Sequence, residues 1–131
     1  MRESAVLTPE QAFAEMVAQG DVVLDRLDHW VETQPDKVFI DYGEDDLRLG
    51  FAAFSRQVDA VAAGLVRLGA VPGDRVSVMT RNSLVAALVM FACWRSGAIY
   101  APVNFNYKGR LLAYQLDDTA PSVFVVGADC A

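Results

Sequence analysis

Residues 84–94 read LVAALVMFACW, a run of eleven residues without a charged or amide side chain. Asn82 or Ser83 can cap a helix at its start, and Ser96-Gly97 can end that helix. A helix on the surface of a globular domain normally carries one apolar stripe and one polar face. The run therefore predicts a helix that is covered on more than one side.

Short apolar strands alternate with helices on both sides of this run. We predict strands at 75–80, 98–103 and 122–126, a helix over the apolar run and another helix over 109–118. Strands that alternate with helices in this way form parallel units with right-handed crossovers. Residues 71–131 are therefore expected to form a βαβαβ parallel, Rossmann-like unit.

The first half of the chain has a different pattern. Thr8-Pro9-Glu10-Gln11 is a helix start of the capping-box type, and this first helix is expected to stop at Gly20. A second helix is expected from a cap at Asp21 to about residue 33. A hairpin of strands 37–42 and 47–51 follows, and a helix over about 52–68 comes next. We expect three sections: an N-terminal helix (1–20), a helix, hairpin and helix (21–70), and the βαβαβ unit (71–131).

Composition excludes several classes of protein. The net charge of −6 argues against a nucleic-acid partner and against binding to anionic membrane surfaces. The apolar run is too short to span a bilayer and the first residues do not resemble a signal peptide, so we expect a cytoplasmic protein without a transmembrane segment. One histidine and two distant cysteines, Cys93 and Cys130, do not form a metal ligand set, and both cysteines are expected as thiols.

The predicted sheet is small for a complete α/β domain. Three parallel strands need helices on both faces, and the apolar helix needs a cover on its outer side as well. We therefore expect a piece of a larger domain, in which Leu88, Met90 and Phe91 pack at least partly against segments beyond residue 131.

Four segments, taken in order, resemble the adenylate-forming enzymes, specifically the acyl-CoA synthetases. They are QPDKVFIDYG (34–43), LGFAAFSRQVDAVAAGLVRLGAVPGDRVSVMTRNS (49–83), ACWRSGAIYAPVN (92–104) and LLAYQLDDTAPSVFVV (111–126). The resemblance covers about residues 21–127, and its specificity comes from the order and spacing of the segments.

The resemblance implies that the chain is the N-terminal part of the large domain of an ATP-dependent acid–CoA ligase. Such an enzyme uses ATP, Mg²⁺ and coenzyme A, converts a small carboxylic acid to an acyl-adenylate, and then forms the thioester. The family's phosphate loop, ribose-binding Asp and catalytic Lys have no counterpart in these 131 residues. We therefore expect no catalytic residue and no cofactor bound by this segment alone. Its expected partners are the remainder of the enzyme and further copies of the chain in a homo-oligomer.

One loop carries the candidate binding residues. In some relatives an Arg shortly after the Pro-x-Asn segment lies near the coenzyme A phosphates, but Asn106 stands there in this chain. Lys108 and Arg110 follow in the same loop and can supply the charge. The resemblance thus implies a coenzyme A phosphate contact at Asn106, Lys108 and Arg110. The alternative is a solvated loop that leads into the next helix.

Two further alternatives stay open. Gly73-Asp74-Arg75 is either a tight turn into a strand or a phosphate site, and Met90, Phe91 and Trp94 either pack in the core or line an acyl channel. At the level of the whole chain, the alternative to a ligase fragment is a small α/β binding or scaffold module that completes another chain without catalysis.

Overall fold

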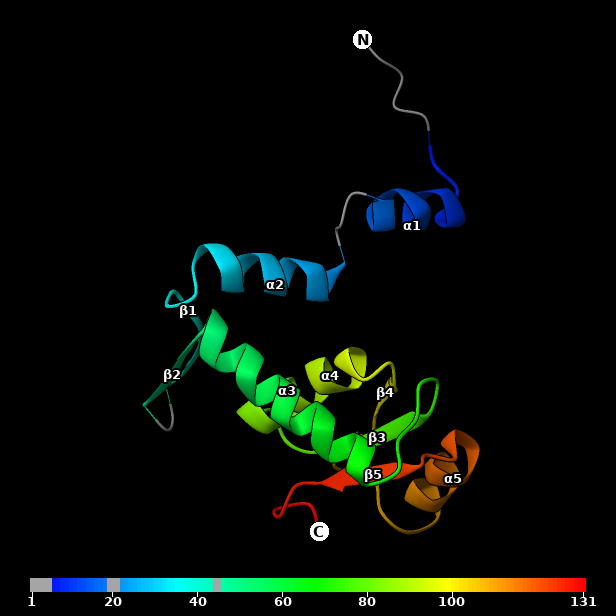
Figure 1. Ribbon diagram of the computed structural model, residues 1–131. Helices are drawn as coiled ribbons and strands as arrows, with labels where there is room; N and C mark the ends of the chain where they lie inside the picture. The colour runs from blue at the N-terminus through cyan, green and yellow to red at the C-terminus, as the bar shows by residue number, and fades with distance from the viewer. Residues whose placement is uncertain (1–5, 19–21, 44–45) are drawn as a thin grey trace.

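The computed structural model describes residues 6–18, 22–43 and 46–131 (Figure 1). Helix α1 (Pro9–Ala18) begins with the predicted capping box, in which the Thr8 amide donates to Gln11 Oε1 (2.9 Å) and the Gln11 amide to Thr8 Oγ1 (3.2 Å). The predicted helix stop at Gly20 and cap at Asp21 lie outside the described residues.

Helix α2 (Val23–Thr33) precedes a β-hairpin. Val22 stands at its N-cap position and makes no side-chain cap hydrogen bond. Strands β1 (Val38–Tyr42) and β2 (Leu47–Gly50) then pair antiparallel, as the sequence predicted, with an irregular register between Val38 and Ile40.

Gly50 joins the hairpin to helix α3 (Phe51–Arg67) without a side-chain cap. The carbonyl of Pro35 accepts from the Ala52 amide (3.0 Å) and that of Lys37 from the Phe51 amide (3.2 Å), so backbone carbonyls satisfy the start of the helix. A Cβ at position 50 would lie 2.9 Å from the Pro35 oxygen. The close approach of the preceding turn explains why glycine stands where a Ser or Thr cap is common.

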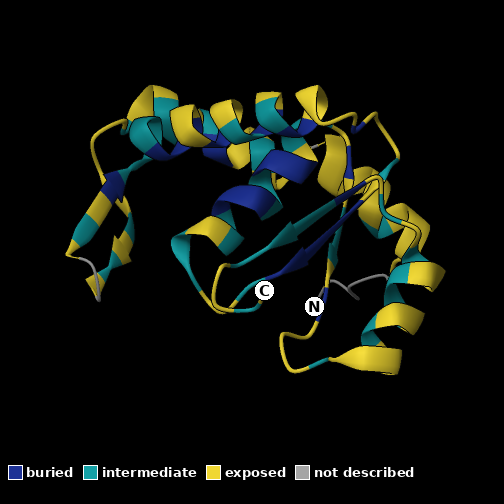
Figure 2. Ribbon diagram, turned by 90° about the horizontal axis from the view of Figure 1, so that it is seen from below, coloured by how far each residue is buried: buried dark blue, intermediate teal, exposed yellow. Residues whose placement is uncertain are grey.

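The second half forms the predicted βαβαβ unit. Its elements are β3 (Arg75–Met79), α4 (Leu84–Arg95), β4 (Ile99–Pro102), α5 (Gly109–Thr119) and β5 (Val123–Val126). The three strands are parallel and lie in the order β4-β3-β5. The two crossovers run in opposite directions along the sheet, so right-handed connections place α4 and α5 on opposite faces. Figure 2 shows this layering, with α3 beyond α4 and α5 on the other side of the strands.

The apolar helix α4 is covered by the sheet on one side and by α3 on the other. Ser83, one of the two predicted caps, accepts a hydrogen bond from the Ala86 amide (3.3 Å). Leu88 is only 8% exposed, so this chain already buries it, and the expectation that Leu88 packs against segments beyond residue 131 is wrong. Met90 and Phe91 are half-buried, whereas Val85 and Trp94 are exposed.

The core lies where α3, α4 and the sheet meet. Phe54, Val58 and Leu65 of α3 are buried, whereas Leu68 is 69% exposed. The helix ends at Arg67 and the chain turns at Gly69, whose φ of +102° requires the left-handed region, so Leu68 lies outside the buried face of α3. In residues 6–18, 22–43 and 46–131, no helix combines the length and hydropathy needed to cross a membrane.

Candidate functional site: the carboxyl edge of the parallel sheet

Three loops meet at the carboxyl edge of the parallel sheet. They comprise residues 80–83 after β3, 103–108 after β4 and 127–130 after β5. Since the strands are parallel, all three loops leave the sheet on the same side, which is where open α/β sheets place their ligands. The carboxyl edge is therefore the expected place for a ligand site in this unit.

Arg81 connects these loops. Its Nε atom lies 2.8 Å from Asp129 Oδ2, which joins the loop after β3 to the loop after β5. The guanidinium carbon lies 4.9 Å from the ring centroid of Phe105, in the loop after β4. Both partners of the ion pair are more than half exposed, so solvent screens their attraction. The ion pair thus links the loops after β3 and β5 and adds little to the free energy of unfolding.

A cavity of about 400 Å³ opens beside this ion pair. Residues 80–83 and 127–129 form two of its walls, and Tyr42 of β1 and Val85 of α4 complete the lining. Tyr42 Oη donates to the Asn82 carbonyl (3.4 Å), so the hairpin contacts the loop after β3. The Gly127 amide donates to the Met79 carbonyl (2.9 Å) and fixes the start of the third loop.

The predicted binding residues lie in the loop after β4 and the start of α5. Asn106 donates its backbone amide to Asn104 Oδ1 (2.9 Å), Lys108 occupies the N-cap position of α5, and Arg110 is in the first turn. All three are exposed, and none of them lines the 400 Å³ cavity. Within the described part of the chain, the side chains of Lys108 and Arg110 make no hydrogen bond or ion pair.

The Gly73-Asp74-Arg75 segment is a turn at the opposite edge of the sheet. Gly73 has a φ of +88°, and Asp74 accepts a hydrogen bond from the Val71 amide (3.0 Å). That backbone hydrogen bond, together with Ser122 and Arg75, lowers the pKa of the Asp74 carboxyl below its usual value. The Asp74 carboxylate therefore closes the turn by accepting a hydrogen bond from an amide within it. The structure supports the tight turn over the phosphate site.

The carboxyl edge offers binding features. It presents the cations Arg81, Lys108 and Arg110, the aromatic ring of Phe105 and a cavity whose mixed lining includes Thr80, Asn82 and Ser83. Among the described residues, no three His, Cys, Asp or Glu side chains come together in a way that holds a metal ion. Sequence reasoning missed Arg81 and Asp129. The available signal was only their place in segments that follow predicted strands, as loop 104–110 does; their composition gave no signal.

Comparison with known proteins identifies the family. The model of the AMP-binding enzyme family matches residues 27–131. Propionate–CoA ligase of Escherichia coli (strain K12) is 32% identical over 123 residues, which are 89% of this chain and 19% of that protein. Feruloyl-CoA synthase of an Amycolatopsis species is 36% identical over 77 residues, which are 59% of this chain and 16% of that protein. The chain thus spans about a fifth or less of the length of these relatives.

Solved structures show the same fold. A putative long-chain-fatty-acid CoA ligase from Rhodopseudomonas palustris superposes with a TM-score of 0.74 at 31% identity, over 80% of this chain and 26% of that one. The N-terminal domain of FACL13 from Mycobacterium tuberculosis superposes with a TM-score of 0.76 at 24% identity, over 80% of this chain and 26% of that one. With the family model matching most of its residues, the chain belongs to the AMP-binding enzyme family.

Proposed function

We propose that residues 1–131 are the N-terminal part of the large domain of an ATP-dependent, AMP-forming acid–CoA ligase, with the three sections 1–20, 21–70 and 71–131. The observation that carries the proposal is the family match over residues 27–131 together with relatives that are CoA ligases of about five times this length. The complete enzyme takes a carboxylic acid, ATP, Mg²⁺ and coenzyme A, and its proposed location is the cytoplasm.

In this proposal the 131 residues hold no catalytic group. They form one part of the adenylate-forming domain and supply part of the surface to which coenzyme A binds. The remainder of the enzyme supplies the phosphate loop and the catalytic lysine. Because phosphoryl transfer depends on positioned cations and metal ions, we expect no adenylation by this segment alone.

The proposed coenzyme A contact is at Asn106, Lys108 and Arg110. Lys108 and Arg110 are exposed, and their cationic groups suit the phosphates of coenzyme A. Asn106 lies in the same loop and is also exposed, but its amide has no charge. Coenzyme A enters only in the thioester-forming half-reaction, so these residues are expected to act on that half-reaction and not on adenylate formation.

The test is to assay the two half-reactions separately in the enzyme that the complete reading frame encodes. Lys108→Ala and Arg110→Ala are expected to raise the KM for coenzyme A about three- to tenfold each, while ATP–pyrophosphate exchange stays within about twofold. Asn106→Arg adds a cation to the loop and is expected to lower that KM.

Arg67→Ala is the matched control, because Arg67 is an exposed cation in the last turn of α3, before the chain enters β3. It is expected to change neither half-reaction. Equal losses in both half-reactions for Lys108→Ala and Arg110→Ala, or no loss in either, would contradict the proposed contact.

A further inference from the structure

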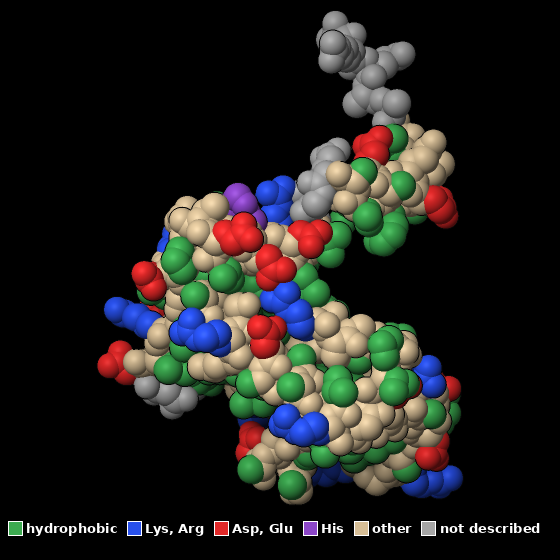
Figure 3. Space-filling view, viewed as in Figure 1, with side chains coloured by type: hydrophobic (Ala, Val, Ile, Leu, Met, Phe, Trp, Pro, Cys, Tyr) green, Lys and Arg blue, Asp and Glu red, His purple; other side chains and the backbone are tan. Residues whose placement is uncertain are grey.

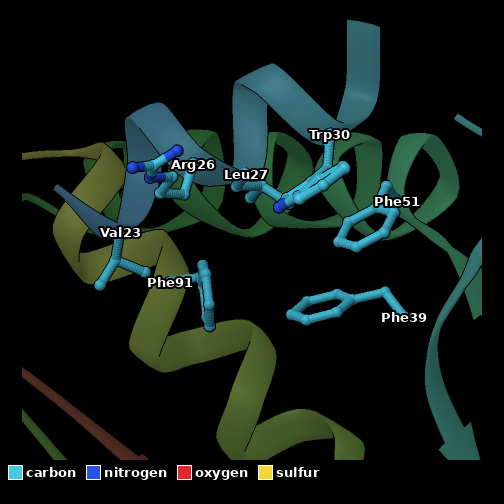
Figure 4. Close-up of a pocket in the computed structure, with 7 residues that line it drawn as sticks. All are labelled: Val23, Arg26, Leu27, Trp30, Phe39, Phe51 and Phe91. Carbon is cyan, nitrogen blue, oxygen red and sulfur yellow. The ribbon is translucent and has the colours of Figure 1, made fainter. Parts of the chain in front are cut away.

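A second cavity, of about 310 Å³, lies between α2, the hairpin, α3 and α4, and none of its lining residues belongs to the carboxyl-edge loops. Four aromatic rings surround it (Figure 4): Trp30 from α2, Phe39 from β1, Phe51 at the start of α3 and Phe91 from α4. Segments that are far apart in the sequence thus bring their aromatic side chains to one place, whereas the sequence left open whether Phe91 packs in the core or lines an acyl channel.

The rings are arranged in two orientations. Phe39 and Phe51 stack with centroids 4.8 Å apart at 16°, and Trp30 stacks on the other side of Phe51 at 6.0 Å and 23°. Phe91 stands nearly perpendicular to Phe39, at 6.2 Å and 79°. Both faces of Phe51 are therefore covered by rings, and a flat apolar body in the cavity meets ring edges and the faces that Trp30, Phe39 and Phe91 leave uncovered.

The cavity is open to solvent on the side of α2. Val23 at its rim is 49% exposed and Phe39 is 37% exposed. Leu27, which is buried, also lines the cavity. Two of the residues that line the cavity are thus accessible to solvent.

Positive charge flanks this opening. Arg26 belongs to the lining, and Lys37 Nζ lies 5.9 Å from the centroid of the Trp30 ring. An apolar cavity with a few charged groups at its mouth is the usual composition of a small-molecule site.

We propose that this cavity binds a small aromatic carboxylate, with its ring system among the four aromatic side chains and its carboxylate at Arg26. A dry cavity of about 150 Å³ holds benzene, so a cavity of about 310 Å³ has room for a bicyclic ring. The proposal goes beyond the ligase function, because the ligand binds here without reacting.

The probe for the test is 2-naphthoate, titrated into the 131-residue chain and followed by calorimetry and NMR. We expect saturable binding with one site per chain and intermolecular NOEs from naphthoate protons to the rings of Phe51 and Phe91. Val23→Phe fills the mouth of the cavity and should weaken binding about tenfold or more. Val66→Phe is the matched control, since Val66 is 56% exposed on α3 and lines no cavity described above; this variant should bind as the wild type does.

The charge at the mouth is tested with a neutral ligand of the same size, 2-naphthalenemethanol. Arg26→Gln should weaken binding of 2-naphthoate about threefold and leave the alcohol unchanged. Arg56→Gln, an exposed cation of α3 outside the cavity, should affect neither ligand.

Three outcomes would overturn the proposal. They are the absence of saturable naphthoate binding, an equal loss in Val23→Phe and Val66→Phe, and ring signals that change with protein concentration but not with naphthoate, which would show a second copy in the cavity. If Val23→Phe does not fold, the wild-type NOEs decide, because naphthoate bound elsewhere gives none to Phe51 and Phe91.

Discussion

Arg95 of α4 donates two hydrogen bonds to Asp28 of α2, from Nη2 to Oδ1 at 2.9 Å and from Nη1 to Oδ2 at 3.1 Å. The same guanidinium contacts α3 through Ser55 Oγ at 3.3 Å and Asp59 Oδ1 at 3.3 Å. Its side chain is 23% exposed, so the interaction is only partly screened by solvent. One arginine therefore holds three helices together.

We predict that Asp28→Ala lowers the free energy of unfolding by about 1–2 kcal/mol, because it removes a paired carboxylate and leaves the half-buried guanidinium with fewer partners. Asp25→Ala, on the exposed side of the same helix, is the control and should change stability by less than about 0.5 kcal/mol. Urea denaturation measures both. If the two substitutions lower the free energy of unfolding equally, Asp28 acts through the helix propensity of α2 and not through its contact with Arg95.

Gly50→Ala should destabilise the chain by about 1–3 kcal/mol, because the new Cβ would lie 2.9 Å from the Pro35 carbonyl oxygen and force the turn away from α3. Gly43→Ala is the matched control, since a Cβ there meets nothing within 4 Å. The two variants are compared by thermal unfolding. A Gly50→Ala chain as stable as Gly43→Ala would contradict the close approach.

Burial raises the pKa of the Cys93 thiol from 9.0 to about 11. Between these values the unfolded chain has lost the proton that the folded chain keeps, so stability falls as pH rises through this window. The expected slope is about 1.4 kcal/mol per pH unit. Tyr100, whose pKa is also raised by burial, adds a loss of the same sign above its ordinary value.

Cys93→Ala removes the thiol and should make the decline in stability between pH 9 and 11 shallower. Cys130→Ala, at a half-buried thiol, is the control and should keep the wild-type slope. Denaturant titrations at several pH values measure the slope of the free energy of unfolding against pH. A wild-type slope in Cys93→Ala would contradict the assignment of this loss to the buried thiol.

The 131-residue chain should self-associate. In the described part of the chain β4 pairs only with β3, which leaves one edge of β4 for another strand, and Ile99 on this strand is 51% exposed. Helix α1 adds apolar surface, because Phe13 and Met16 are exposed. Figure 3 shows a hollow between this helix and the rest of the molecule, with hydrophobic side chains of the helix facing it.

Ile99→Lys places a charge on the strand edge and should weaken association several-fold in sedimentation equilibrium. Val66→Lys, an equally exposed site on α3, should not. A wild-type chain that is monomeric at all concentrations would show that neither the β4 edge nor the apolar surface of α1 drives association.

Local patterns were sufficient to predict most of the fold. Periodicity and turn residues located each helix and strand, and the alternation of strands and helices gave the parallel unit. Strand order was not predicted, because it depends on which side of β3 each crossover returns to. Leu88 was misjudged for a related reason: α4 packs against α3, an element distant in sequence, and no local pattern gives the position of α3 over α4.

The candidate site was predicted less completely. The loop after β4 was found because its composition is unusual, with two cations and two aromatic residues. Arg81 and Asp129 carry no such local signal, and their relation arises only when β3 and β5 become neighbours in the sheet. The aromatic cavity beneath α2 likewise requires four elements to pack before its rings meet.

The central claim is that this chain is one part of an acid–CoA ligase and does not catalyse by itself. The most direct measurement is AMP and acyl-CoA formation from ATP, Mg²⁺, coenzyme A and a panel of carboxylic acids. It compares the 131-residue chain with the protein encoded by the complete reading frame. The account predicts no product from the 131 residues and stoichiometric AMP and thioester, with at least one acid, from the complete protein. Turnover by the 131-residue chain, or a reading frame that stops after Ala131, would contradict it.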